Sequence, residues 1–247
     1  MTARIGLPSS TGSQPPWDAF NLGNHVGDEL LDVNRHRREL AEALGAQPLW
    51  LQQVHGHRVV RLTRPTLNEL AEAQADGAFT TEPGLACTVM VADCLPILLA
   101  APEGRGVAAL HAGWRGLAGA GDMGGAGIAD TGVAALCEAS ACDPADLRAW
   151  LGPCIGPSVF QVGADVLRGF GVDPSGPAHP RFVRQSSDRW LADLAGLAKD
   201  RLRASGVRGI DGGTWCTVTE ASRFFSFRRD RVTGRQAACI WLDDRRR

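Results

Sequence analysis

Apolar residues follow a helical spacing in several parts of the chain. Segment 28–44 has apolar positions three and four residues apart and stops at Gly45, a residue type that often ends helices, so the pattern predicts a helix there. The same spacing predicts four further helices, near 66–75, 128–139, 161–170 and 191–204.

Shorter apolar runs predict strands among these helices. They lie at 49–54, 58–62, 87–91, 95–100, 106–111 and 147–151, with further short strands within 214–242. The glycine-dense segment 113–127 is expected to be a loop. Strands and helices mix without strict alternation, and no repeat or long linker divides the chain. We therefore expect one α/β (α+β) domain over residues 1–247, a layered α/β sandwich with mixed sheets.

Composition limits the partners and the compartment. The formal net charge is −1, so no overall positive field favours nucleic acid. No apolar run is long enough for a secretory signal or a membrane span, so no membrane partner is expected. The 7 cysteines include no Cys-x-x-Cys pair. This pattern is typical of reduced thiols in a cytoplasmic protein.

One hairpin places two reactive side chains together. Two apolar runs flank the turn-forming segment 102–105. If 101–104 forms a four-residue loop, opposed residues in the antiparallel ladder have numbers that sum to 205, as Cys94 and His111 do. Their Cβ atoms would then lie about 5 Å apart on one face of the sheet. The inference depends on this register.

A thiolate beside an imidazole suits either a metal ion or a nucleophilic Cys–His pair. His55 is the natural third member, because it stands in a turn directly after a predicted strand. Asp93 adjoins Cys94 and is a candidate for proton transfer or for orienting the other groups. Residue spacing leaves both kinds of chemistry open.

Three short motifs resemble the metal-site motifs of the YfiH-type laccase-domain family, also called purine nucleoside phosphorylases or peptidoglycan editing factors. They are Gln53-Val-His-Gly56, Ala92-Asp-Cys-Leu-Pro96 and His111-Ala-Gly-Trp-Arg-Gly116. Further matches occur in the family's order over nearly the whole chain, at 21–28, 75–78, 151–157, 224–230 and 233–235.

The resemblance implies zinc bound by His55, Cys94 and His111, although copper also suits a Cys/His site. With Asp93, these ligands are the expected catalytic residues. The resemblance also implies phosphorolysis of purine nucleosides (adenosine, inosine, guanosine and methylthioadenosine) with adenosine deamination alongside. Purine nucleosides and phosphate are therefore the expected partners.

Arginines are the expected phosphate ligands, because the guanidinium group can bind an oxyanion with two hydrogen bonds. The candidates are Arg115, four residues after His111, and the neighbours Arg228 and Arg229. Further candidates for substrate contact are Asn21, Gln53 and, as an aromatic surface for the purine, Phe225.

Two positions depart from the family pattern, and three other functions stay open. Gln161 stands where the family usually has Glu, and Phe227 where it usually has Tyr. Either change could remove a proton donor. The alternatives are a cysteine hydrolase that edits peptidoglycan precursors, a copper-dependent polyphenol oxidase, and a binding module without activity. A multicopper cluster would need more imidazoles than 6 scattered histidines supply.

Overall fold

The computed structural model describes residues 1–4, 12–71 and 73–243. Its centre is a mixed six-stranded sheet. In spatial order the strands are β11 (Gly209–Gly212), β7 (Arg148–Leu151), β5 (Leu95–Ala100), β6 (Val107–Ala112), β3 (Gly77–Thr80) and β2 (Val59–Arg61). The two edge pairs, β11–β7 and β2–β3, are parallel, and the inner pairs are antiparallel.

A three-stranded sheet packs against one face of this central sheet. Its order is β1 (Gln47–Pro48), β4 (Leu85–Val91) and β12 (Gln236–Trp241). Side chains alternate along a strand, so Leu98 of β5 and Ala109 of β6 face Leu85 and Val89 of β4 in the core between the sheets. A core therefore fills the space between the two sheets.

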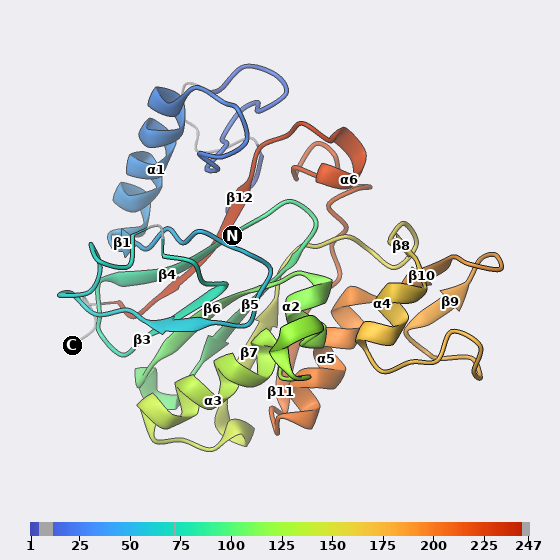
Figure 1. Cartoon of the computed structure of the whole chain (residues 1–247). Coiled ribbons are helices and arrows are strands. Elements are labelled where there is room, and N and C mark those ends of the chain that lie inside the picture. Colours follow the sequence, from blue (N-terminus) through green and yellow to red (C-terminus); the bar gives the residue numbers. More distant parts are fainter. Residues whose placement is uncertain (5–11, 72, 244–247) are drawn as a thin grey trace.

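Helices cover the two outer faces of this pair of sheets. The central sheet carries α2 (Trp114–Ala118), α3 (Ile128–Ser140) and α5 (Leu194–Ala204) on its free face, and α1 (Leu30–Leu44) covers the small sheet. Figure 1 shows α1 and α3 at opposite ends of the stack, with β4 and β6 between them. The expected layered sandwich with mixed sheets is confirmed.

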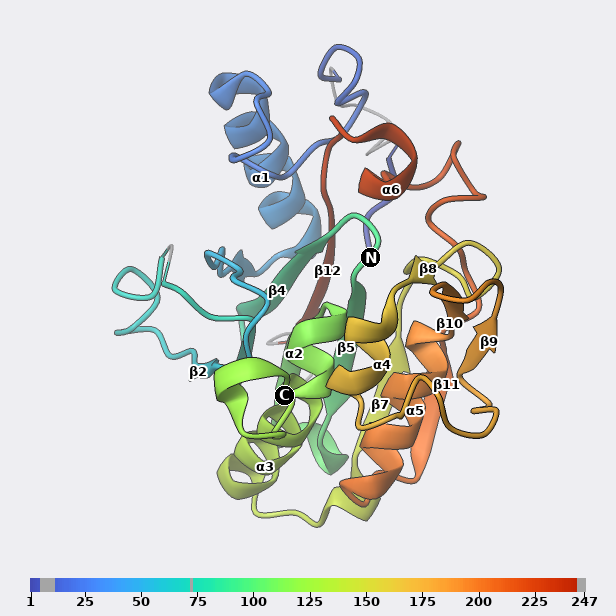
Figure 2. The ribbon, with the colours of Figure 1, turned by 45° about the vertical axis from the view of Figure 1, so that its right-hand side comes forward.

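The remaining elements lie at one side of the stack. A second small sheet has the order β8 (Gln161–Val162), β10 (Trp190–Ala192), β9 (Phe182–Arg184). Figure 2 shows it beside α4 (Ala164–Gly169), while α6 (Phe227–Asp230) lies near the turn between β4 and β5. Three 3-10 helices span Pro102–Gly104, Gly121–Met123 and Pro144–Asp146. None of the helices in the described residues is long and apolar enough to cross a membrane.

Three sequence predictions of secondary structure were wrong in part. Residues 66–71 form turns, because the Thr63 and Thr66 hydroxyls bond the backbone locally and compete with a helix. Gln74 forms an isolated bridge with Gln52, and residue 72 lies outside the description. The segment 161–170 begins with strand β8 and becomes helical only after Gly163. The segment 49–54 bonds the neighbouring strand at Leu49 and then continues as a loop.

Two further segments differ from their predictions. The glycine-dense stretch 113–127 contains helix α2, which ends at Gly119 in the left-handed conformation (φ 67°). Within 214–242 the structure has one strand, β12, and the arginine-rich turn is the short helix α6.

The predicted hairpin register was also wrong, by two residues. Pro96 pairs with His111 and Ala100 with Val107, so opposed numbers sum to 207. The loop is longer than expected because Pro102–Gly104 forms a 3-10 turn. A register shift of two residues leaves each side chain on the same face of the sheet. The prediction that Cys94 and His111 share a face is therefore unaffected by this error.

Candidate metal and substrate site

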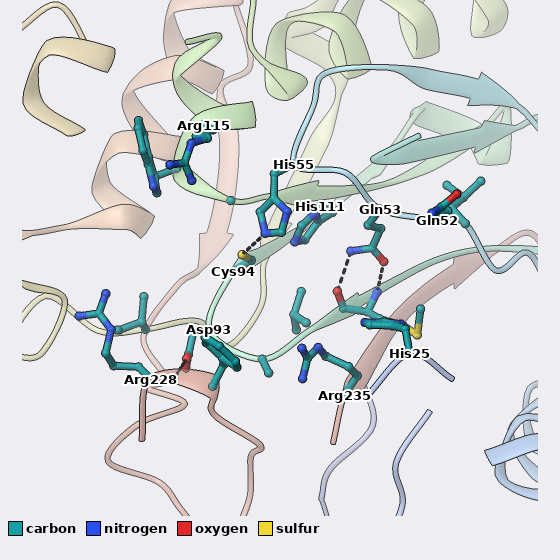
Figure 3. A pocket seen from close by; sticks show the side chains of 18 of the residues that line it. His25, Gln52, Gln53, His55, Asp93, Cys94, His111, Arg115, Arg228 and Arg235 are labelled. Atoms are coloured by element: carbon teal, nitrogen blue, oxygen red, sulfur yellow. Dashed lines mark hydrogen bonds between the residues drawn. The ribbon is translucent and has the colours of Figure 1, made fainter. Parts of the chain in front are cut away.

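A cavity of about 760 Å³ opens at one end of the two packed sheets. It lies where β4 and β6 end and α2 begins, and it is also lined by residues of the 50–55 loop, of α6 and of the segment before β12. Figure 3 shows the histidine, cysteine and arginine side chains that converge on it.

Three side chains at one wall of the cavity could hold a metal ion. The ligand atoms of His55, Cys94 and His111 all lie within 4.8 Å of one another. The His55 Nε2 and Cys94 Sγ atoms are 3.7 Å apart, and the two imidazole rings meet edge to face. His111 is buried, Cys94 is half-buried and His55 is exposed, so one side of the group is open to the cavity.

A buried carboxylate, Asp76, fixes the ring of His111. Asp76 lies directly before β3 and is fully buried, and its Oδ1 accepts a hydrogen bond of 2.8 Å from His111 Nδ1. With the proton on Nδ1, the Nε2 lone pair is free for a metal ion. Burial alone would raise the pKa of Asp76, but the bonds from His111 and from the Gly56 and Val54 amides lower it below its usual value.

The same carboxylate shapes the loop that carries His55. The backbone N–H groups of Val54, His55 and Gly56 donate to Asp76 at 3.2, 2.9 and 2.7 Å. These bonds hold His55 at a positive φ of 60°, which non-glycine residues seldom adopt. One carboxylate therefore positions two of the three candidate ligands.

Cys94 follows a second backbone position with positive φ, Asp93 at 97°. One carboxylate oxygen of Asp93 accepts from the Thr217 hydroxyl at 2.6 Å, and the other accepts from the Arg228 amide at 2.6 Å. These bonds connect the turn between β4 and β5 to α6 and to the segment before α6. Asp93 lines the cavity, but both its oxygens already have protein partners.

The thiol and the buried imidazole stabilise each other's charged forms. Burial raises the pKa of Cys94, but the His111 charge and hydrogen bonds from both imidazoles outweigh it and lower that pKa to about 6. For His111, burial lowers the pKa, but Cys94 and Asp76 outweigh it and raise that pKa to about 9. In the metal-free protein the pair is therefore a thiolate and an imidazolium at neutral pH.

Close backbone approach explains two glycines of the 111–116 motif. A Cβ on Gly113 would lie 2.7 Å from His55 Cδ2 and 3.2 Å from Cys94 Sγ. A Cβ on Gly116 would collide with the carbonyl oxygen of Gly56. Helix α2 can therefore pack against the His55 loop only with glycine at both positions.

Gln53 and Arg115 both line the cavity. The Gln53 amide donates to the Met90 carbonyl at 2.8 Å and accepts from the Met90 N–H at 2.7 Å, which ties the His55 loop to β4 (Figure 3). Arg115 is exposed and stacks on Trp114 at 4.5 Å from the ring centroid. Gln53 thus has a structural role in this cavity wall, and Arg115 is placed to meet a ligand.

The adjacent arginines of α6 differ in position. Arg228 lines the cavity, lies over the Phe160 ring and donates to the Gln161 carbonyl at 3.1 Å. Arg229 is outside the lining; it bonds the carbonyls of residues 217, 218 and 224 and the carboxylate of Asp230. These contacts indicate that Arg229 stabilises the local backbone and does not meet a ligand.

Asn21 and Phe225 also lie outside the cavity lining, and both are fully buried. Phe225 packs against Gly234 and the Arg4 guanidinium. The Asn21 side chain bonds residues 23, 28 and 235. The structure brings neither side chain to the ligand group.

The sequence analysis gave no role to two residues that the structure places at the site. Asp76 lies within a segment noted as a family match, 75–78, and that match was the available signal. Arg235 lines the cavity although it lies far along the chain from all three candidate ligands. It also lies within a segment noted as a family match, 233–235, which was the available signal.

Comparison with known proteins places the whole chain in one family. Residues 6–243 match the family model described as multi-copper polyphenol oxidoreductase laccase. The chain is 44% identical over 233 residues to purine nucleoside phosphorylase YfiH of Shigella flexneri, covering 93% of this chain and 89% of that protein. It is 42% identical to purine nucleoside phosphorylase PA4543 of Pseudomonas aeruginosa, with coverages of 99% and 94%.

Solved structures agree with the family model and the relatives. Protein NMB0706 of Neisseria meningitidis superposes with a TM-score of 0.85 at 39% identity, covering 98% of this chain and 93% of that one. YlmD of Geobacillus stearothermophilus superposes with a TM-score of 0.86 at 32% identity, with coverages of 98% and 90%. The chain therefore belongs to the YfiH-type laccase-domain family.

Proposed function

We propose that this chain is a zinc-dependent purine nucleoside phosphorylase with adenosine deaminase side activity. The observation that carries the proposal is the His55–Cys94–His111 group at the wall of a cavity that also presents arginines and aromatic side chains. The relatives named purine nucleoside phosphorylase support the reaction class.

The donor set fits zinc. Two imidazoles and one thiolate leave a fourth tetrahedral position open, as catalytic zinc sites do. When bound, zinc supplies Lewis-acid chemistry that polarises an oxygen atom of phosphate, substrate or water. Copper binds the same donors tightly and is the alternative metal. In the described part of the chain this is one group of three ligands, whereas a multicopper centre requires more imidazoles.

The remaining lining residues include both apolar and charged side chains, which suit the two parts of the substrate. The lining includes apolar side chains suited to contact a purine ring, among them Ile155, Phe160, Leu194 and Phe227. Arginines 115 and 228 provide positive charge beside it. In phosphorolysis a phosphate oxygen forms a bond to C1′ while the C1′–N9 bond breaks, and the purine leaves with that electron pair and takes up a proton. Holding both reactants in one cavity supplies much of the rate enhancement.

Two further points belong to this proposal. We also propose that residues 1–247 form one domain, and the pairing of strand β12 with β4 from the first half of the chain supports this. We propose a cytoplasmic location for the reaction, and the seven free cysteines support it, since disulfides form mainly in oxidising compartments.

The test compares the wild type with Cys94→Ala and the control Cys142→Ala, a half-buried cysteine outside the cavity. Each is incubated with adenosine or inosine, with and without phosphate. We expect about one zinc per chain and phosphate-dependent base release in the wild type and the control. Both should be lost in Cys94→Ala, with activity reduced by about a thousandfold or more.

Two results would contradict the proposal. If base release did not depend on phosphate, the reaction would be hydrolysis and not phosphorolysis. Activity that survives removal of the metal but is abolished by alkylation of Cys94 would favour the cysteine hydrolase instead.

A further inference from the structure

Two segments from opposite ends of the chain meet at the cavity wall that faces the metal-ligand group. Residues 21–25 precede α1, and residues 233–235 precede β12. The buried Asn21 side chain joins them, because its Oδ1 accepts from the Gly23 amide at 2.9 Å and the Arg235 amide at 2.8 Å. A Cβ on Gly23 would lie 2.8 Å from Arg235 Cγ, so the two segments are in close contact.

This junction positions the Arg235 side chain in the cavity. Its Nη1 donates to the Thr233 and Gly234 carbonyls, both at 3.1 Å, which fixes one edge of the guanidinium group. Among the ion pairs of the described residues none includes Arg235. Burial lowers the pKa of Arg235, while Cys94 and Asp93 raise it, so its charge lies within reach of the candidate metal site. Figure 3 shows it across the cavity from Cys94 and His111.

Two more basic side chains line the same wall. Arg37 of α1 stacks on Trp50 and donates from Nε to the Leu22 carbonyl, next to the Asn21 junction. His25 lies beside Arg235 (Figure 3), and burial together with the charges of Arg235 and Arg37 lowers its pKa. The wall therefore carries the positive charge of Arg37 and Arg235, and the neutral His25 ring adds a hydrogen-bonding group beside them. In the described residues no carboxylate forms an ion pair with Arg235.

We propose that Arg235, with His25 and Arg37, forms an anion subsite that binds the phosphate group of a ligand. A half-buried guanidinium without an ion-pair partner favours an oxyanion, to which it can donate two hydrogen bonds. The identification of that group as free orthophosphate depends on the phosphorylase function proposed above. The other source of the same chemistry is the 5′-phosphate of a nucleotide.

This assignment separates the two reactants of phosphorolysis. Arg228 lies over the Phe160 ring and adjoins Phe227 in the chain, and Figure 3 shows Arg228 apart from Arg235. A purine held by these two rings and a phosphate held by Arg235 would approach the sugar from different sides. Nucleophile and leaving group need this arrangement, since one bond to C1′ forms as the other breaks.

The test measures binding of inorganic phosphate and of adenosine 5′-monophosphate to zinc-loaded protein by calorimetry, without turnover. The variants are Arg235→Gln, Arg235→Lys and the control Arg208→Gln, an exposed arginine outside the cavity. We expect Arg235→Gln to raise the phosphate dissociation constant by about tenfold to a hundredfold, Arg235→Lys to raise it less, and the control to leave it unchanged. Zinc content should be equal in all four proteins.

Each outcome bears on the subsite. Weaker binding of orthophosphate supports the free ion, and weaker binding of the monophosphate alone supports a nucleotide as the source. Unchanged binding of both by a folded, zinc-loaded Arg235→Gln or Arg235→Lys protein overturns the subsite. Wild type that binds phosphate through Arg235 but releases no purine would contradict the phosphorylase function and leave the subsite standing. If Arg235→Gln carried out phosphorolysis with an unchanged KM for phosphate, the phosphorylase function would stand and the subsite would be wrong.

Discussion

Two walls of the cavity differ in whether their charged side chains are paired with one another. At the metal-ligand wall, Cys94 and His111 stabilise each other's charges, and Asp76 adds a fully buried carboxylate behind them. At the opposite wall, Arg235 bonds to backbone carbonyls and has no ion pair among the described residues. Unpaired buried charge is costly, so the first wall is complete by itself and the second favours a ligand that carries negative charge.

The two walls also differ in how the chain builds them. Residues 55, 76, 94 and 111 lie on neighbouring loops and strand ends of the two packed sheets. Arg235 instead reaches the cavity because the buried Asn21 joins the segment before α1 to the segment before β12. Removing a hydrogen bond at the metal-ligand wall should therefore alter metal binding. Removing one at the Arg235 wall should alter only the binding of the anionic ligand.

The largest effect is expected on the Cys94 thiol of the metal-free protein. Its pKa of about 6 depends chiefly on the His111 charge, so His111→Gln should move it up toward the ordinary value of 9.0. The measurement is the pH profile of alkylation at Cys94 by iodoacetamide. His57→Gln is the control, because His57 is close in sequence but lies outside the cavity. A midpoint that stays near 6 in His111→Gln would refute the pairing.

The same pKa values give the direction of the pH dependence. The pKa of Cys94 is depressed, so its stabilising contribution is lost as pH falls from 9.0 through 6; the pKa of His111 is raised, so its contribution is lost as pH rises from 6.5 through 9. The metal-free ion pair thus exists between about pH 6 and 9. Below that window protons compete with the metal for both ligands.

A smaller but still large effect is expected from Asp76→Asn. The substitution removes the charge that fixes the His111 tautomer and leaves fewer acceptor sites for three backbone amides. We expect metal affinity to fall by about tenfold to a hundredfold, measured by competition with a chelating dye. Asp93→Asn is the comparison within the site. Its partners are Thr217 and the Arg228 amide, so metal affinity should change by less than about threefold. Equal losses in both variants would contradict the role of Asp76.

The sequence predicted the layered fold and the convergence of His55, Cys94 and His111, because alternation and short motifs are local signals. The hairpin register was wrong, since a 3-10 turn lengthened the loop, and a shift of two happened to preserve the face of the sheet. Contacts between distant segments were not predictable. Neither the four bonds of Asp76 nor the junction of Asn21 with Arg235 has a sequence spacing that a single chain reveals.

For the same reason, residue type alone could not tell which substrate candidates lie at the cavity. Arg228 and Arg229 are adjacent and chemically equal, but the backbone of α6 turns one to the cavity and the other to backbone carbonyls. Phe225 and Phe227 differ likewise: the first is fully buried, and the second is 48% exposed and lines the cavity. Which of two equal side chains meets a ligand is decided by tertiary packing.

The smallest effect is expected from Phe227→Tyr, which introduces the tyrosine that the resemblance to the family leads us to expect at this position. The side chain is already at the cavity wall, so the added hydroxyl changes little beyond one hydrogen bond to the ligand. We expect the KM for nucleoside to fall by about twofold to fivefold, with the KM for phosphate unchanged. The control Phe170→Tyr makes the same change in a half-buried ring outside the cavity and should leave both constants as they are.

Arg235→Gln should show the reverse pattern, in which the KM for phosphate changes and the KM for nucleoside does not. If Phe227→Tyr instead shifted the KM for phosphate, Phe227 and Arg235 would serve the same part of the ligand, and the division of the cavity into two walls would be wrong.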